Sequence, residues 1–198
     1  MKVFLNPGHD RDYDSGAVNP NNGARECDVA YRIGVRVKGY LEAVGIQVRM
    51  LQSDNLDWDS RYDDRQDTCV CDEANNWPAD IFVAIHCDAF NTEAHGTSSQ
   101  IYAHGGRAEI LGQYIHDQIT KSLGTVKRGL VDRTGLIVLS HTDMPAALIE
   151  TAFIDNDADC DLLLNKEDEF ARAIARGITD YQQKDHQNLE QDAKYLKK

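Results

Sequence analysis

The stretch Ala79-Asp80-Ile81-Phe82-Val83-Ala84-Ile85-His86-Cys87-Asp88 decides the fold of this chain. Its nearly continuous apolar run, from Asp80 to His86, is typical of a central strand that is buried on both faces of a parallel sheet. On both sides of this run, segments with strand patterns alternate with segments of helical period. That alternation indicates an α/β fold.

The flanking segments predict one domain. Strands are also expected over residues 2–6, 46–51, 98–103, 136–139 and 147–151. Apolar residues recur at helical spacing over residues 25–44, 60–76, 108–122, 159–164 and 167–181. We therefore predict a single α/β domain with a twisted, mixed but mainly parallel sheet, which helices flank on both faces. Residues 182–198 carry few apolar anchors, so they are expected to form a helical extension or a disordered tail.

Composition narrows the classes of partner. The chain has 198 residues and a formal net charge of -12, which argues against binding to nucleic acid or to an anionic membrane surface. No apolar run reaches the length of a membrane span, so we expect no membrane insertion. The five cysteines form an odd, scattered set, and the pair Cys69 and Cys71 has the wrong spacing for a zinc knuckle. A reduced compartment is the simplest interpretation.

Three polar residues are expected to meet at one edge of the sheet. His9 follows the strand over residues 2–6, and His86 ends the central strand. Glu26 lies one helical turn before Val29 and Ala30, so it projects from the inward side of its helix. Ligands of open α/β sheets gather beyond the carboxyl ends of the strands. Two imidazoles and one carboxylate are the protein ligands of a catalytic zinc site, with a fourth position left for water.

Each of these residues also has a plain structural interpretation. A lone histidine can cap a strand, and an acidic residue in the first turn of a helix is favoured by the helix dipole. Glu150 closes the apolar run Ala146-Ala147-Leu148-Ile149, where an ionised carboxylate is costly unless it is paired or functional. Glu150 is therefore either a salt-bridged structural residue or a base that acts on water. The convergence of His9, Glu26 and His86 favours the metal site.

At these residues the sequence resembles the zinc-dependent N-acetylmuramoyl-L-alanine amidases of bacterial cell walls, a group called amidase type 3. The matching pieces are Leu5-Asn6-Pro7-Gly8-His9, Glu26 at the head of a helix, the stretch 79–89, and Met144-Pro145-Ala146-Ala147-Leu148-Ile149-Glu150-Thr151-Ala152-Phe153-Ile154-Asp155-Asn156. Their order and spacing run through almost the whole chain apart from the tail. The sequence departs from the family pattern at Cys87, where a small residue is common. Strand alternation turns Cys87 away from His86, so it is not counted as a ligand.

The resemblance implies a concrete activity on a phosphorylase/hydrolase-like fold. Residues 1–181 would form the catalytic amidase domain, and His9, Glu26 and His86 would bind one zinc ion per chain. Glu150 would be the catalytic glutamate, taking a proton from water and delivering it to the leaving nitrogen. The substrate would be peptidoglycan, and the bond cut would be the amide between N-acetylmuramic acid and L-alanine. Such an enzyme would act as an autolysin or an endolysin; the oligomeric state cannot be predicted.

Two rival functions stay open at this stage. One is a zinc hydrolase of the exopeptidase kind on a similar sheet, which commonly binds two metal ions and needs more carboxylate ligands. The other is a non-catalytic wall-binding protein that keeps the fold, but such a protein usually lacks a ligand or the catalytic glutamate.

The beginning of the chain, Met1-Lys2-Val3-Phe4-Leu5, leads directly into a predicted core strand. No apolar export segment with a small-residue cleavage site is visible, so we expect a protein made in the cytoplasm without a signal peptide. For a protein that acts on the cell wall, this fits a phage lysin, an enzyme released by lysis of its own cell, or an exported protein that has been trimmed.

A few further residues near the predicted site have two interpretations. Arg128 and Arg133 could bind carboxylates of the stem peptide, but solvated surface residues are the simpler interpretation. His141 could line the cleft or lie in a solvated loop. Asp10 and Asp88 could orient the neighbouring histidines, although adjacent residues of a strand seldom point the same way.

Overall fold

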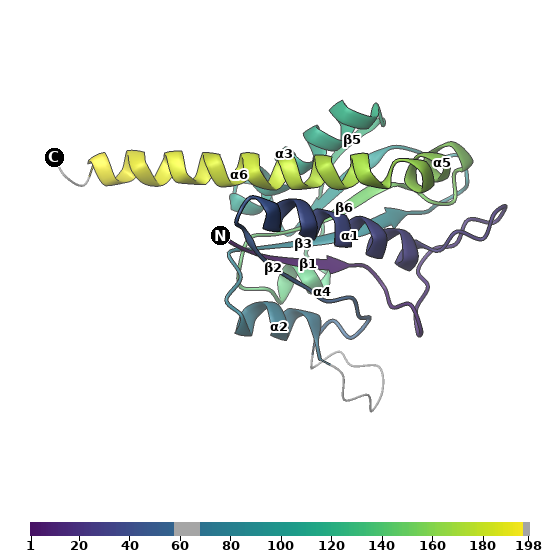
Figure 1. The fold of residues 1–198 in the computed structure, drawn as a ribbon, viewed down its shortest axis with the longest axis horizontal. Coiled ribbons are helices and arrows are strands. Elements are labelled where there is room, and N and C mark those ends of the chain that lie inside the picture. The colour runs from purple at the N-terminus through teal and green to yellow at the C-terminus, as the bar shows by residue number, and fades with distance from the viewer. Residues whose placement is uncertain (58–67, 196–198) are drawn as a thin grey trace.

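One sheet organises the computed structural model, which describes residues 1–57 and 68–195 (Figure 1). Its six strands lie in the order β2-β1-β3-β6-β4-β5. Their bounds are β1 Lys2–Pro7, β2 Gln47–Met50, β3 Ile81–Asp88, β4 Thr97–Ile101, β5 Lys127–Asp132 and β6 Ala146–Phe153. The helices are α1 Glu26–Ala43, α2 Val70–Asn76, α3 Arg107–Leu123, α4 Ile137–Ser140, α5 Asp157–Asn165 and α6 Glu167–Tyr195.

The sheet is mixed but mainly parallel, as the sequence predicts. The pairs β1–β2, β1–β3, β3–β6 and β4–β5 are parallel, and only the pair β4–β6 among these strands is antiparallel. The carboxyl ends of β1, β3 and β6 therefore share one edge of the sheet with the amino ends of β4 and β5. This edge is where ligands of an open α/β sheet are expected.

Helices cover both faces of the sheet and enclose two apolar cores. The larger core packs α1, α3 and α6 on one face, with alternate strand residues such as Val3, Leu5 and Ile85. The smaller core lies on the other face beneath α2 and α4, and it contains Phe4 and Phe82. These two rings stack with their centroids 5.7 Å apart, because Phe4 and Phe82 are register partners on β1 and β3. Alternation along each strand thus supplies both cores.

Two predicted elements differ from the structure. The strand expected over residues 136–139 is wrong, since Ile137–Ser140 forms the short helix α4. A run of four apolar residues does not distinguish a strand from a buried helical turn, and here Val138 and Leu139 pack into the smaller core. The sequence analysis also missed the edge strand β5, whose sequence KRGLVD has neither apolar alternation nor a long apolar run. In the predicted helix 60–76, residues 58–67 lie outside the described part, and α2 confirms the end of that helix.

The last helix continues past the predicted end at residue 181. Helix α6 runs without interruption to Tyr195 and extends beyond the end of the sheet (Figure 1). Residues 182–195, for which a helical extension or a disordered tail is expected, are part of α6. Among the helices of the described ranges, α6 included, none combines the length and apolar character that crossing a membrane requires.

His116 on α3 is a buried imidazole outside the sheet edge. It is 1% exposed, and neither ring nitrogen has a hydrogen-bond partner within residues 1–57 and 68–195. Desolvation lowers the pKa of His116 below its usual value near 6.5, against the raising effect of Asp117. Because the unfolded chain then binds a proton more readily, His116 destabilises the folded state increasingly as the pH falls below about 6.5.

We predict that His116→Leu raises the free energy of unfolding by about 1 kcal/mol at pH 7, because it removes an unpartnered polar group from the core. The gain should be larger at pH 5, because the lowered pKa of His116 destabilises the folded wild type increasingly as the pH falls. Urea unfolding at both pH values measures this difference, with His95→Leu as a control that removes an exposed imidazole. An equal change in the free energy of unfolding at both pH values would contradict a lowered pKa of His116.

Candidate metal centre

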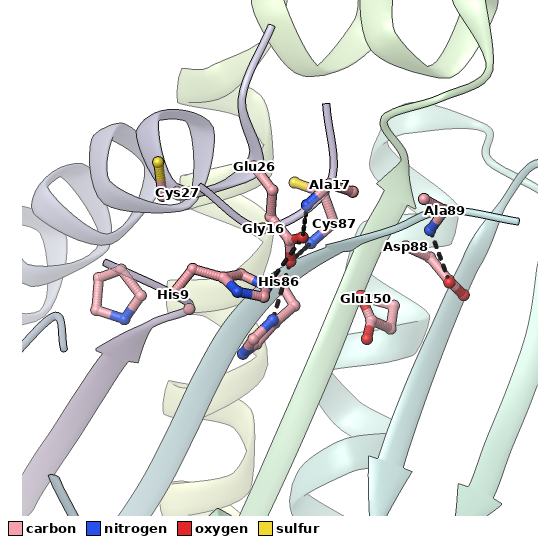
Figure 2. Close-up of polar contacts among 12 residues, drawn as sticks. His9, Gly16, Ala17, Glu26, Cys27, His86, Cys87, Asp88, Ala89 and Glu150 are labelled. Atoms are coloured by element: carbon pink, nitrogen blue, oxygen red, sulfur yellow. Dashed lines mark hydrogen bonds and ion pairs between the residues drawn. The ribbon is translucent and has the colours of Figure 1, made fainter. Parts of the chain in front are cut away.

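Three side chains predicted to bind metal meet at the shared edge of the sheet (Figure 2). His9 lies two residues beyond the end of β1, Glu26 is the first residue of α1, and His86 lies near the end of β3. His9 Nε2 lies 3.0 Å from Glu26 Oε2, and His86 Nδ1 lies 2.9 Å from Glu26 Oε1. The two imidazoles therefore approach one carboxylate, one at each of its oxygens.

The Glu26 carboxylate is 4% exposed and surrounded by donors. The backbone N–H of Cys87 donates to its Oε1 over 2.9 Å, and the N–H of Ala17 donates to its Oε2 over 3.0 Å. Burial alone would raise the pKa of Glu26, but the hydrogen bonds and charges of His86 and His9 hold it well below its usual range. Burial alone would lower the pKa of His9, but Glu26 and then Asp14 raise it to about 9. The Glu26 carboxylate thus stabilises positive charge on the groups that surround it.

The donor set fits a divalent metal ion of the zinc type. One ligand atom from each of His9, Glu26 and His86 can be chosen so that all lie within 4.8 Å of one another. In a tetrahedral zinc site with bonds of about 2.0–2.2 Å, ligand atoms lie roughly 3.4 Å apart. Small side-chain movements would therefore bring these three groups to ligand distance of one ion.

Asp14 supports this centre in a way that the sequence analysis missed. Its Oδ2 lies 2.7 Å from Nδ1 of His9, the nitrogen on the far side of the ring from Glu26. A carboxylate in this position fixes the tautomer and the orientation of a metal-binding imidazole. Asp10 and Asp88 are the other candidates for this role, but their carboxylates accept backbone N–H groups of Asp12 and Ala89 instead. Asp14 lies in an irregular loop, where no periodicity indicates the direction of a side chain.

Two glycines let the backbone approach the centre closely. A Cβ on Gly8 would lie 2.2 Å from Cε1 of His86. A Cβ on Gly16 would lie 2.5 Å from Cδ2 of His9 and 2.6 Å from Oε2 of Glu26, and the φ of Gly16 is 64°. Both positions therefore require glycine for space, and Gly16 also for its left-handed backbone.

We predict that Gly16→Ala lowers zinc affinity by at least about tenfold, since the added methyl displaces His9 and Glu26 together. It should also cost about 1–3 kcal/mol of stability through backbone strain. Gly39→Ala is the matched control, because a Cβ there meets nothing within 4 Å. Competitive zinc titration of both variants measures the effect, and equal affinities would contradict the close packing.

Glu150 lies beside this group on the neighbouring strand. It is the register partner of His86 across β3 and β6 (Figure 2). Gln100 Nε2 donates to its Oε1 over 3.2 Å, whereas its Oε2 is buried and has no hydrogen-bond partner among the described residues. Burial, and next the negative charges of Glu26 and Asp88, raise the pKa of Glu150 well above its usual value. No salt bridge to Glu150 occurs in the described ranges, so the structural alternative for this residue lacks its expected partner.

The predictions for the cysteines and for His141 can be compared with the structure. Cys87 points away from His86, as alternation predicts, since its Sγ lies 3.5 Å from Oγ1 of buried Thr151. All five cysteines are buried and free of disulfides. His141 follows α4, is exposed, and forms an ion pair with Asp57.

A pocket of about 210 Å³ opens onto His9 and His86 from the face of the smaller core. We call it the imidazole pocket. His9, His86 and Asp14 line its polar side, and the apolar lining is Leu56, Leu136, Ile137, Val138 and Leu148. A ligand can therefore reach the edge of the two imidazoles from solvent.

Comparison with known proteins agrees with this architecture. The family model described as N-acetylmuramoyl-L-alanine amidase matches residues 3–180. The chain is 31% identical over 184 residues to the N-acetylmuramoyl-L-alanine amidase LytC of Bacillus subtilis, covering 90% of this chain and 35% of LytC. It is 32% identical over 186 residues to the endolysin of Bacillus phage SPP1, covering 88% of this chain and 62% of that protein. The chain thus spans about a third to two thirds of the length of these relatives.

Solved structures share the fold. The N-acetylmuramoyl-L-alanine amidase AmiC2 of Nostoc punctiforme superposes with a TM-score of 0.78 at 27% identity, over 92% of this chain and 97% of AmiC2. Cwp6 from Clostridium difficile gives a TM-score of 0.79 at 29% identity, over 91% of this chain and 29% of Cwp6. The predicted fold class is confirmed, and so is the predicted family. The chain belongs to the N-acetylmuramoyl-L-alanine amidase family.

Proposed function

We propose that this chain is a zinc-dependent hydrolase that cleaves the amide between N-acetylmuramic acid and L-alanine in peptidoglycan. The observation that carries the proposal is the meeting of His9, Glu26 and His86 beside Glu150 in a chain of this family. The imidazoles of His9 and His86 and the carboxylate of Glu26 would hold one zinc ion per chain. When bound, zinc lowers the pKa of a water molecule to about 7 and polarises an amide carbonyl.

Glu150 would move the proton. Its carboxylate accepts a proton from the attacking water while the hydroxyl oxygen bonds to the amide carbon. The same carboxyl then delivers the proton to the nitrogen as the C–N bond breaks, leaving a lactyl carboxylate and a new peptide amino group. A raised pKa suits this role, because the group must both take up and release a proton near neutral pH. Gln100 donates to Oε1 of Glu150, which leaves Oε2 as the oxygen without a hydrogen bond among the described residues.

Two features disfavour the rival functions. The described residues hold a single group of three potential metal ligands, whereas a two-metal exopeptidase site needs more carboxylates. A non-catalytic wall-binding protein has no need of Glu150, whose burial without a salt bridge to any described residue is unfavourable. The family match favours the amidase over both.

The same proposal covers domain organisation and place of action. Residues 1–181 would form the catalytic domain, and the part of α6 after Tyr181 would be a helical extension of it. The site of action would be the cell wall, as for a peptidoglycan hydrolase.

The direct test is turnover of purified peptidoglycan. We expect release of new amino groups on N-terminal alanine without new reducing sugar ends, which distinguishes an amidase from a glycosidase. A chelator should abolish the release, and added zinc should restore it. Release that continues after complete removal of metal would refute the mechanism, and release of amino acids from peptide carboxyl ends would indicate an exopeptidase.

A further inference from the structure

A second pocket, of about 400 Å³, lies over β4 and β5 on the same face of the sheet as Glu150. We call it the arginine pocket. Ser98 and Gln100 form part of its floor, and Lys127, Arg128 and Arg133 bring positive charge to it. In a chain of net charge -12, three cations around one hollow are an unusual concentration.

The arginine pocket and the imidazole pocket adjoin each other across two strands. Gln100 of the arginine pocket is the register partner of Leu148, which lines the imidazole pocket. Glu150 stands between them, since it follows Leu148 by two residues and accepts the hydrogen bond of Gln100 over 3.2 Å. The order along the sheet edge is therefore His9, His86, Glu150 and then the arginine pocket.

Two of the three cations form no salt bridge with the described residues. Lys127 is paired with Asp117 over 3.0 Å. The guanidinium of Arg128 lies 4.9 Å from the centroid of the Phe153 ring and donates to the carbonyl oxygen of His95, and neither it nor Arg133 is in a salt bridge within the described ranges. The backbone N–H of Arg133 donates to the carbonyl of Ile101 over 2.8 Å, which fixes its place at the end of β5.

Only one acidic side chain is among the residues that line this pocket within the described part of the chain. It belongs to Asp88, whose Oδ1 accepts the backbone N–H of Ala89. Two exposed guanidinium groups, one held against an aromatic ring, thus line a hollow that contains a single lining carboxylate among the described residues, that of Asp88. Arginine is suited to bind a carboxylate through two parallel hydrogen bonds.

We propose that Arg128 and Arg133 bind a carboxylate of the substrate peptide, on the side of the scissile amide that leaves as the amine. This inference rests on the proposed amidase function and assigns the acidic peptide to the β4–β5 side of Glu150. The muramoyl group then lies on the imidazole side. The two arginines determine specificity and take no part in proton transfer.

The test compares two compounds, N-acetylmuramoyl-L-alanyl-D-glutamic acid and the same compound with both carboxylates of its glutamate amidated. Their dissociation constants are measured by calorimetry on zinc-loaded Glu150→Gln protein, so that no turnover is needed. We expect the acid to bind about tenfold more tightly than the amide. In the same background, Arg128→Gln combined with Arg133→Gln should remove this preference by weakening only the acid.

The matched control is Arg49→Gln, which removes one positive charge on β2 at the opposite edge of the sheet and should preserve the preference. Equal binding of acid and amide by the parent protein would overturn the inference, as would an unchanged preference in the double variant. Neither result affects the proposed function, which is judged separately by release of amino groups from peptidoglycan with the wild-type chain. In that assay the double arginine variant should raise KM and leave kcat nearly unchanged.

Discussion

Replacing Glu150 with glutamine should lower kcat on peptidoglycan by about a thousandfold while one zinc ion per chain stays bound. Positioned acid–base catalysis contributes about 10²–10⁴-fold, and the amide of glutamine can neither accept the proton of water nor deliver one to nitrogen. Glutamine keeps the size of the side chain, and the buried site already disfavours the charge of Glu150. The fold should therefore tolerate the exchange, with an unfolding midpoint no lower than that of the wild type.

The control for this experiment is Glu109→Gln, which removes an exposed carboxylate that pairs with His104. It should leave both kcat and zinc content unchanged. If Glu150→Gln retains more than about a tenth of wild-type kcat, Glu150 is not the group that moves the proton. A loss of zinc in this variant would instead assign Glu150 to the ligands.

Replacing Glu26 with glutamine should lower zinc affinity by at least about a hundredfold and abolish turnover at trace zinc. The substitution removes the only negative charge among the three proposed ligands. It also breaks the local hydrogen bonding, because both carboxylate oxygens accept a backbone N–H, from Cys87 and from Ala17. A glutamine amide has one acceptor, so one of these N–H groups would face an NH₂ group. An unmatched buried donor costs about 1–3 kcal/mol.

Competitive titration with a zinc-binding dye measures this loss, and urea unfolding without metal measures the change in stability. Glu109→Gln serves again as the control for removal of one carboxylate. Wild-type zinc affinity in Glu26→Gln would show that the buried carboxylate is only a structural partner of His9 and His86.

The parts of the fold that could be predicted are those that a buried environment imposes on the sequence. The apolar run from Ile81 to Ile85 is typical of a strand that is covered on both faces. The meeting of His9 and His86 could be predicted because both come at or just beyond the ends of such strands, whose positions fix the edge of the sheet. Helical period then placed Glu26 on the inward side of α1. The positions of these residues could be predicted because the local sequence pattern around each one also determines where it lies in the fold.

The parts that could not be predicted depend on contacts between distant segments. The apolar residues of α4 are as compatible with a strand as with a helix. Packing against the smaller core determines that they form a helix. Strand β5 lies at an edge of the sheet and is mostly exposed, so burial imposes little apolar pattern on its sequence. Asp14 reaches His9 from an irregular loop, and Gln100 reaches Glu150 across an antiparallel pairing that no short motif specifies. The adjoining position of the arginine pocket follows from that same pairing.

The most direct measurement is X-ray diffraction from crystals of the zinc-loaded chain at energies on either side of the zinc absorption edge. The account predicts one anomalous peak per chain that appears only above the edge, about 2.0–2.2 Å from an imidazole nitrogen of His9, an imidazole nitrogen of His86 and a carboxylate oxygen of Glu26. A fully folded chain with no such peak, or with a peak whose ligands omit any of these three residues, would contradict it.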